Sequence, residues 1–275
     1  MPRYGATQFA MPDFHGATRR LVLVNMFAYF GLALLVLTMP PLKASGLLSG
    51  LAFDPYLFLH GGFWQPLTYS LVHPPGALMG TLFELLSIWF LAGFLENFHN
   101  STWITSLYAV SVLGTAVAAT AIYACAGTFG FAISEIPLAG CMGGIFGLLV
   151  AIGVLYGNTQ FLMFFIIGIK AKYLVAIYAL IEVASLLFSQ QRMHAFAQLG
   201  GALAGLLYVR LASRRGITFA FSEKWYGLRN RYYRWKRRRA SRKFEVYMRR
   251  QGRTVHIDGY GRPIEKDPDD KKHWN

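Results

Sequence analysis

An all-α polytopic membrane protein is the fold class that the sequence predicts, on the evidence of its composition and its apolar runs. Hydrophobic residues make up 55% of the chain and charged residues only 15%. Several apolar runs approach or exceed the roughly 18–20 residues that a helix needs to cross a bilayer. Six such runs can be separated, so we expect a bundle of six membrane-spanning helices.

The six predicted spans begin close to the N-terminus and continue to about residue 212. They cover residues 20–39, 78–95, 102–125, 139–157, 171–189 and 193–212. The first run ends at Pro40 and Pro41, which do not continue a helix easily. It lacks a small-residue cleavage site, so it is predicted to be a retained helix and not a signal peptide.

Two apolar segments are predicted to lie outside the spans. Residues 42–77 are rich in Phe, Trp, Tyr, Gly and Pro with few charges, so we expect short helices at the membrane interface, with Trp64 and Tyr69 at headgroup level. The stretch FLMFFII, residues 161–167, is too short to span. It is predicted to be either interfacial or an early start of the fifth span.

The charge of the chain is concentrated in its last segment. The net charge is +14, and from Ser213 onward there are 19 Lys or Arg and 7 Asp or Glu, a net charge of +12. The predicted domains are an N-terminal segment 1–19, a membrane domain 20–212 and a basic, partly disordered tail 213–275. Basic residues flank the first and last spans, so the positive-inside rule predicts that both termini are cytoplasmic.

The tail contains the sequence RNRYYRWKRRRASRKF directly after a span. Basic residues interleaved with aromatics in this place predict attraction to anionic lipid, with docking of an acidic partner as an alternative. No recognisable nucleic-acid-binding module is present. The residues expected to contact lipid or a partner are Arg234, Lys236, Arg237, Arg238 and Arg239.

Neither the cysteines nor the histidines predict a cofactor. Cys125 and Cys141 lie in apolar surroundings that are typical of small buried thiols, and no structural disulfide is expected. No two histidines have the i, i+3 or i, i+4 spacing of a helical metal site, so no metal ion is expected either. The histidines considered, for which loop or capping roles are predicted, are His60, His73, His99 and His194.

Glycines four residues apart predict which spans lie next to each other. Such pairs let helices approach closely in lipid, where van der Waals contact replaces the hydrophobic drive. The fourth and sixth spans both contain them, so these spans are predicted neighbours. The predicted packing residues are Gly140, Gly143, Gly147, Gly201 and Gly205.

With its neighbours, the stretch GCMGGIFGLL at 140–149 resembles the fourth transmembrane helix of rhomboid intramembrane serine proteases. In that family the helix opens with G-x-S-G, and the Ser is the nucleophile. Four further stretches are similar to other parts of the family, in the same order: FWQPLTYSLVH, SIWFLAGFLE, GIKAKYLVAIYALIE and AQLGGALAGLLY. The resemblance covers roughly residues 20–212 and implies a six-helix bundle with an interfacial loop between the first two helices.

The resemblance also implies that the catalytic positions of the family have changed. It places Met142 at the position of the nucleophile, Gln198 at that of the base, and Glu84 and Gly80 where an Asn and a His would support the oxyanion. A thioether is not a useful nucleophile and an amide is not a base near neutral pH. Cys141 is one residue out of register and has no base. We therefore expect a catalytically inactive rhomboid-like protein, a pseudoprotease.

Two carboxyl groups lie within predicted spans, where a carboxyl is expensive and usually faces a partner or a cavity. Our hypothesis is that Glu84 hydrogen-bonds Gln198 and fills the former catalytic cavity, with a ligand or client contact and proton transfer as alternatives. Glu182 is predicted to have a packing or interface role.

The predicted function is binding of transmembrane segments of partner proteins without catalysis. Such a protein is either a regulatory factor or a structural subunit of a larger membrane complex. The alternative is an active intramembrane protease that uses unrecognised residues. A transporter is the weaker third option, because the spans contain too few charged residues for an ion path. The compact form, without a large luminal domain, favours a bacterial inner membrane.

Overall fold

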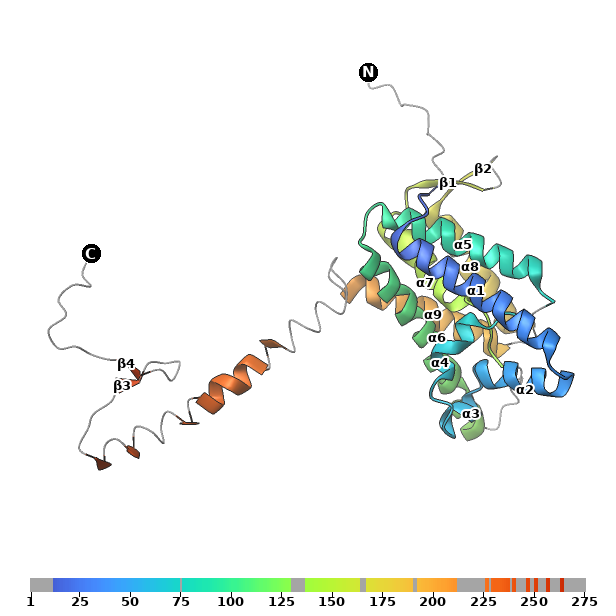
Figure 1. Ribbon diagram of the computed structural model, residues 1–275. Coiled ribbons are helices and arrows are strands. Elements are labelled where there is room, and N and C mark those ends of the chain that lie inside the picture. Colours follow the sequence, from blue (N-terminus) through green and yellow to red (C-terminus); the bar gives the residue numbers. More distant parts are fainter. Residues whose placement is uncertain are drawn as a thin grey trace, which may run out of the picture. The chain divides into compact units, whose positions relative to one another are not determined.

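The structure is a computed structural model, shown in Figure 1, in which the chain divides into two units, Met1–Ile217 and Thr218–Asn275. It describes residues 12–74, 76–129, 137–163, 167–189 and 192–211 of the first unit. In the second unit it describes residues 226–227, 229–237, 239–240, 246–247, 250–251, 256–257 and 263–264.

Within the described residues, the first unit contains six long helices, and this confirms the prediction of a mostly helical membrane protein. Their bounds are Gly16–Thr38 (α1), Leu78–Glu96 (α5), Ser101–Phe129 (α6), Met142–Leu155 (α7), Ala171–Phe188 (α8) and Arg192–Leu211 (α9). Within the described residues, α1, α5, α6 and α8 are long and apolar enough to cross a membrane, while α7 is apolar but shorter.

The segment between α1 and α5 folds into short helices. These are Pro41–Leu51 (α2), Pro55–Leu59 (α3), Gln65–Thr68 (α4) and the 3-10 helix Tyr69–Leu71 (η1). Proline at the first position suits α2 and α3, because that backbone nitrogen needs no hydrogen bond within the helix. The Asp54 side chain caps α3 by accepting a hydrogen bond of 2.8 Å from the amide of Tyr56.

Tyr69 packs inside the bundle, whereas its predicted place at headgroup level stays a prediction. Its side chain is buried, and its hydroxyl donates a hydrogen bond of 2.8 Å to the carbonyl of Val112 in α6. Burial raises the pKa of Tyr69, so the hydroxyl keeps its proton as this bond requires. Trp64 is exposed, and its indole donates to the carbonyl of Gly50 at 3.0 Å.

A β-hairpin interrupts the helical fold after α7. The strands Gln160–Met163 (β1) and Ile167–Lys170 (β2) pair antiparallel at one end of the bundle, opposite α2 and α3 (Figure 1). The predicted early start of the fifth span is therefore wrong, because α8 begins only at Ala171. The amide of Ala171 donates to the carbonyl of Thr159 at 2.9 Å, which ties the start of α8 to the hairpin. A short strand pair, His256–Ile257 (β3) with Pro263–Ile264 (β4), occurs in the second unit.

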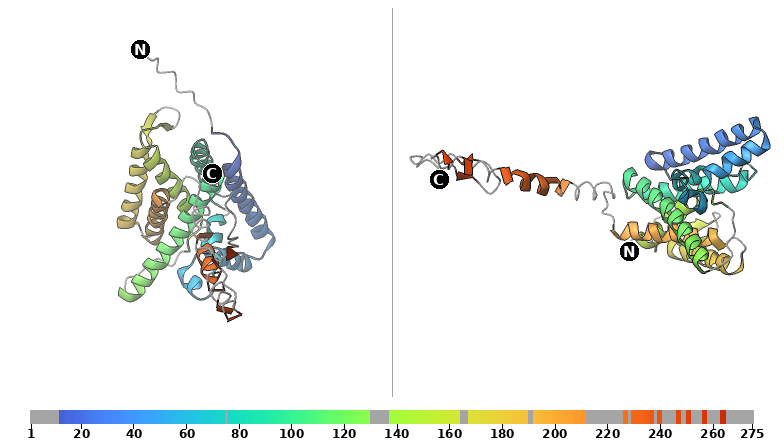
Figure 2. Two further views of the ribbon diagram at one scale, coloured as in Figure 1. Left: turned by 90° about the vertical axis from the view of Figure 1, so that its left-hand side faces the viewer. Right: turned by 90° about the horizontal axis from the view of Figure 1, so that it is seen from below.

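The core of the bundle is the contact of α6 with α7 and α9, and α6 lies side by side with α9 in both views of Figure 2. A Cβ atom on Gly147 of α7 would overlap the side chain of Ser111 in α6. A Cβ atom on Gly205 of α9 would lie 2.8 Å from the Cα atom of Gly147. The three helices therefore pack at a distance that only glycine permits.

Glu96, the last residue of α5, joins the starts of two other helices. Its carboxylate accepts hydrogen bonds from the amides of Ala17 and Thr18, at 2.7 and 3.1 Å, near the start of α1. It also accepts from the hydroxyls of Thr18 and Ser101, at 2.7 and 2.6 Å. A carboxylate at the N-terminus of a helix satisfies free amides and complements the helix dipole. The start of α1 is thus fixed at the end of α5.

We expect Gly147→Ala to destabilise the protein. The overlap with Ser111 costs about 1–3 kcal/mol when a packed core is overfilled, which outweighs a gain in helix propensity of up to about 1 kcal/mol. Gly127→Ala in α6 is the matched control, because nothing lies within 4 Å of the added Cβ atom. Thermal unfolding in detergent should give a lower midpoint for Gly147→Ala and an unchanged or higher one for Gly127→Ala. Equal midpoints would contradict the packing described here.

Candidate functional site: the His73–Glu84–Cys141 cluster

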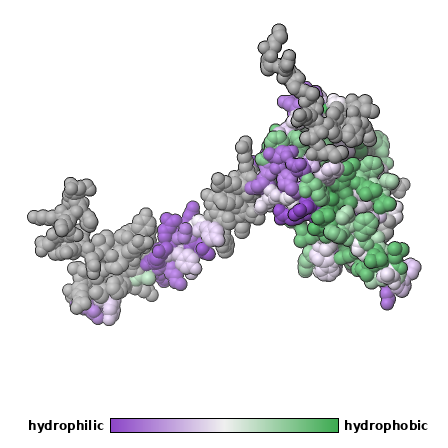
Figure 3. Space-filling model, turned by 45° about the horizontal axis from the view of Figure 1, so that its top comes forward, coloured by the Kyte–Doolittle hydropathy of each residue, from purple (hydrophilic) through white to green (hydrophobic). Residues whose placement is uncertain are grey.

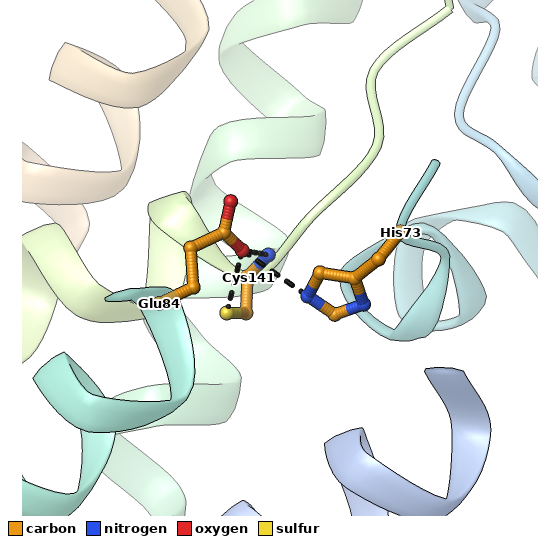
Figure 4. A group of neighbouring side chains, drawn as sticks. All are labelled: His73, Glu84 and Cys141. Atoms are coloured by element: carbon orange, nitrogen blue, oxygen red, sulfur yellow. Dashed lines mark hydrogen bonds and ion pairs between the residues drawn. The ribbon is translucent and has the colours of Figure 1, made fainter. Parts of the chain in front are cut away.

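Three side chains with different chemistry meet where the segment before α5 reaches the start of α7 (Figure 4). His73 follows η1, Glu84 lies in the second turn of α5, and Cys141 directly precedes α7. The nitrogen, oxygen and sulfur atoms that these residues offer all lie within 4.8 Å of one another. We call these three residues the polar cluster.

One oxygen of Glu84 is the centre of the polar cluster. Glu84 Oε2 lies 3.1 Å from His73 Nε2, and it accepts hydrogen bonds from Cys141 Sγ at 3.0 Å and from the Cys141 amide at 3.1 Å. The other ring nitrogen of His73, Nδ1, lies 3.2 Å from the carbonyl of Leu71. His73 and Cys141 are buried, while the Glu84 side chain is 22% exposed.

Gly140 provides the turn that directs the Cys141 amide at Glu84. Its φ of 96° lies in the left-handed region, which favours glycine. A Cβ atom at Gly140 would lie 3.3 Å from both carboxylate oxygens of Glu84, so the glycine also leaves room for the carboxylate. The amide of Gly140 donates to the carbonyl of Tyr69 at 3.0 Å, which holds the turn against η1. The sequence identified Gly140 as a packing residue, and the structure places it beside the polar cluster.

A thiol, an imidazole and a carboxylate can together form a nucleophile, a base and an orienting group. Here, however, the imidazole and the thiol both bond Glu84, and within the described residues no hydrogen bond joins them to each other. Cys141 is fully buried, so a substrate has no direct approach to its sulfur. The geometry instead links three separate parts of the chain. It also brings together three atoms of the kinds that bind metal ions.

The predicted hydrogen bond between Glu84 and Gln198 is wrong. Within the described residues Glu84 bonds His73 and Cys141 and not Gln198, whose Oε1 atom is buried without a hydrogen-bond partner. The backbone turn at Gly140 offers Glu84 donors that the sequence pattern does not reveal. Met142, the first residue of α7, is half-buried and packs against the core. Gly80 is exposed on α5, and the nearest atom to a Cβ built there is the Ala77 Cβ atom at 4.0 Å.

The remaining predicted packing glycines lie on α7 and α9. A Cβ atom on Gly143 or on Gly201 would overlap the hydroxyl of Thr115 in α6, so both glycines pack against the same residue. The carbonyl of Gly143 lies 3.1 Å from the Cβ position of Gly201. Gly147 and Gly205 form the next contact along the same two helices.

The remaining predicted histidines lie outside the polar cluster. His60 Nδ1 lies 2.8 Å from the carbonyl of Tyr56, at the end of α3. His99 stacks on Trp103 with the ring centroids 4.0 Å apart. His194 lies near the start of α9, where its Nδ1 atom is buried without a hydrogen-bond partner.

The basic residues of the tail belong to the second unit. The described ones are exposed, and Arg229 and Arg239 lie over the rings of Tyr226 and Trp235, at 4.7 and 5.5 Å from the centroids. The exposed residues of the predicted contact set are Arg234, Lys236, Arg237 and Arg239. Arg238 lies outside the described residues.

Comparison with known proteins corrects two of the predictions. One family model, described as "Eukaryotic integral membrane protein (DUF1751)", matches residues 20–235, and no curated protein matches the chain. The matching family is not the rhomboid proteases, so the expected membership in that family is wrong. The resemblance rests on short stretches that contain glycines, and small residues are enriched at helix interfaces of membrane proteins in general. The predicted bacterial inner membrane is also wrong, because the family is eukaryotic. The matched region covers most of the chain, and this protein therefore belongs to the eukaryotic integral membrane protein family DUF1751.

Proposed function

We propose that this protein is a non-catalytic integral membrane protein that binds transmembrane segments of partner proteins. It acts either as a regulatory factor or as a structural subunit of a larger membrane complex. The observation that carries the proposal is Glu182 on α8, a carboxyl group that has no hydrogen bond or ion pair within the described residues; α8 is the least buried of the four candidate spans.

Helix α8 contributes little of its surface to the bundle. Only 6% of the residues in its apolar stretch are buried, against 33% in α5 and in α6. Its outward side chains include Leu180, Leu187 and Phe188, which are 69%, 61% and 85% exposed. A broad hydrophobic surface covers the visible face of the first unit (Figure 3). Apolar exposure of this kind suits lipid or another helix equally well.

The carboxyl group of Glu182 favours another helix over lipid as the neighbour of α8. It is half-buried, between the exposed residues Ile181 and Val183, and within the described part of the chain it has no hydrogen bond or ion pair. Lipid chains offer no donor to a carboxyl group, so an unpaired one inside a span is expensive. A partner helix that carries a Ser, Asn, Gln, Lys or Arg side chain at the same depth supplies that donor. A polar transmembrane segment is therefore the best-matched occupant.

The absence of catalysis is part of the proposal. The thiol of Cys141 is buried, and the imidazole of His73 lies against Glu84 instead of the thiol. The imidazole is therefore not placed to activate the sulfur, which donates to the Glu84 carboxylate instead. Cleavage of transmembrane substrates by the purified protein, lost in Cys141→Ser, would overturn this part.

We also propose that all six long helices cross the membrane. Three contacts support this by placing helix ends together. The end of α7 meets the start of α6 through Tyr156, whose hydroxyl lies 3.2 Å from His99 Nε2. The end of α9 meets the start of α6 where the Tyr208 hydroxyl donates to the carbonyl of Trp103 at 3.2 Å. Residues 53 and 138, which precede α3 and α7, pair as a β-bridge. The helix ends therefore alternate between two levels.

The six-span arrangement predicts the sidedness of two loops. Residues 97–100 and 156–159 should lie on the same side of the membrane, opposite to residues 52–54. Single cysteines introduced at Asn100, Asn158 and Asp54 of a cysteine-free variant can be labelled with a membrane-impermeant reagent in sealed vesicles. In one vesicle orientation, the cysteines at positions 100 and 158 should both be labelled, and the cysteine at position 54 only after permeabilisation. In the other orientation, the cysteine at position 54 should be labelled, and the other two only after permeabilisation. Labelling of the cysteines at positions 100 and 158 from opposite sides of the membrane would contradict the proposal of six membrane-spanning helices.

Binding at α8 predicts site-specific crosslinks. A photoreactive amino acid at Tyr178 or Ile181, which lie on the same side of α8 as Glu182 and are 39% and 53% exposed, should give adducts of discrete mass in native membranes. The control is Val117 on α6, which is 69% exposed and should give only diffuse lipid adducts. Glu182→Leu should lower the yield at Tyr178 by about 3- to 30-fold, the value of one hydrogen bond between membrane helices. Glu182→Gln, which keeps two hydrogen-bonding atoms, should lower it less.

Two outcomes of the crosslinking experiment would contradict the proposal. The first is the same diffuse pattern at Tyr178, Ile181 and Val117, which would mean that lipid covers this side of α8. The second is a discrete adduct whose yield is unaffected by Glu182→Leu, because the carboxyl group would then have no part in binding.

We propose that the basic residues of the tail contact anionic lipid, since exposed Arg and Lys with interleaved Tyr and Trp bind such surfaces. In nanodiscs that contain phosphatidylserine, trypsin should cut the tail several-fold more slowly than in neutral nanodiscs, and raised salt should remove the protection. Arg234→Gln combined with Arg237→Gln should weaken the protection. Equal cleavage rates in both lipids would contradict the contact.

A further inference from the structure

We propose that His73, Glu84 and Cys141 bind a zinc ion, which fastens the segment before α5 to the start of α7. An imidazole nitrogen, a carboxylate oxygen and a thiolate sulfur are the three kinds of atom that zinc takes from proteins. The residues come from three elements of the fold. A metal ion between them would act as a crosslink inside the membrane domain.

The distances suit a tetrahedral ion. Usual zinc bond lengths place ligand atoms about 3.4–3.6 Å apart in a tetrahedral site. Glu84 Oε2 lies 3.1 Å from His73 Nε2 and 3.0 Å from Cys141 Sγ, and all three atoms lie within 4.8 Å of one another. The two distances to Glu84 Oε2 would have to lengthen by about half an ångström, and the separation of His73 Nε2 from Cys141 Sγ, at most 4.8 Å, would have to shorten by up to about 1.2 Å.

The protons of His73 favour a cation at this place. Both ring nitrogens face oxygen acceptors, Nδ1 the carbonyl of Leu71 and Nε2 the carboxylate of Glu84. A neutral imidazole carries one N–H and donates to only one of these acceptors, whereas an imidazolium donates to both. With the proton on Nδ1, the lone pair of Nε2 points at the carboxylate, and a metal ion between the two would be bound by both groups. A metal-bound histidine usually donates its other N–H to a carbonyl or carboxylate, as His73 would to Leu71.

The total charge of the occupied site also suits its surroundings. A zinc ion with a thiolate, a carboxylate and a neutral imidazole has no net charge, which limits the penalty of burying charged groups. Within the described residues Glu84 has no ion pair with Lys or Arg, so no other fixed cation compensates it. A thiolate and a carboxylate 3 Å apart would repel each other without such a cation.

Two neighbouring features suit a bound ion. The ring of Tyr108 packs where a Cβ atom of Gly144 would lie, in the first turn of α7, and its buried hydroxyl has no hydrogen-bond partner in the described structure. We expect this hydroxyl to bond a water molecule that serves as the fourth ligand. Glu84, whose side chain is 22% exposed, is the most exposed of the three ligands. The mixed nitrogen, oxygen and sulfur set disfavours Mg²⁺ and Ca²⁺, which require oxygen ligands.

The metal content of the full-length protein tests the proposal. The protein, purified in mild detergent after growth with zinc, should contain about one zinc ion per chain by elemental mass spectrometry. Cys141→Ser and His73→Gln should each lower this content by at least about tenfold. Cys125→Ser is the matched control, because Cys125 is exposed on α6, and it should keep the wild-type content. Cobalt in place of zinc should give a thiolate-to-cobalt absorption band that Cys141→Ser abolishes.

The wild-type protein alone can overturn the proposal, even if a variant does not fold. The wild-type protein can be loaded with zinc and its folded state verified by a sharp thermal unfolding transition. If such protein retains no metal after free ions are removed, the site is excluded. Copper or iron in place of zinc would contradict the choice of metal. A metal content that is lost in Cys125→Ser and retained in Cys141→Ser would assign the ion elsewhere.

Discussion

The close approach of α6, α7 and α9 at their glycines is the constraint on which the rest of the structure depends. Helices in lipid gain nothing from burying apolar surface against one another, so contact at short range has to hold them. Gly147 and Gly205 bring the backbones of α7 and α9 together, and Ser111 fills the space beside them. The Ser111 hydroxyl donates to the carbonyl of Leu107 at 2.9 Å, so close packing leaves no polar atom unpaired there. The start of α7 is fixed as a result, and the polar cluster depends on that position.

Three carboxyl groups in apolar helices meet the same energetic problem in different ways. Glu96 accepts four hydrogen bonds and organises the starts of α1 and α6. Glu84 lies opposite a histidine and a cysteine, and these three groups can either share hydrogen bonds or bind a metal ion. Glu182 has no partner within the described residues. Lipid offers no hydrogen-bond donor to any of these carboxyl groups, so each needs a partner. Glu96 connects helix ends, Glu84 is part of a candidate metal site, and Glu182 is a candidate contact for another protein.

The helical part of the fold could be predicted because long apolar runs have few alternatives in a membrane. The predicted run 171–189 agrees closely with α8, for example, since Lys170 and Ser189 flank it. The run FLMFFII could not be assigned in the same way, because seven apolar residues fit a strand, a helix end or an interfacial turn. The hairpin depends instead on contacts around Thr159 and Gly157 that fix the start of α8.

The candidate site could be predicted only in part. Glu84 was evident as a carboxyl group within an apolar run, but its partners were not. His73 lies 11 residues from it and Cys141 lies 57 residues from it, and they meet through the left-handed turn at Gly140. No spacing rule for a single helix detects such a group. The resemblance to proteases predicted Gln198 as the partner of Glu84, because it is based on stretches of glycine and aromatic residues that reflect helix packing and not the partners of a carboxyl group.

The central claim is that α8 binds a transmembrane segment of another protein. The most direct test is an electron cryomicroscopy structure of the protein purified from its native membrane in mild detergent and placed in nanodiscs. The account predicts an additional helix against Tyr178 and Ile181, with a donor side chain within hydrogen-bond distance of Glu182. Density for lipid chains alone along the whole of α8, with Glu182 facing no protein, would contradict it.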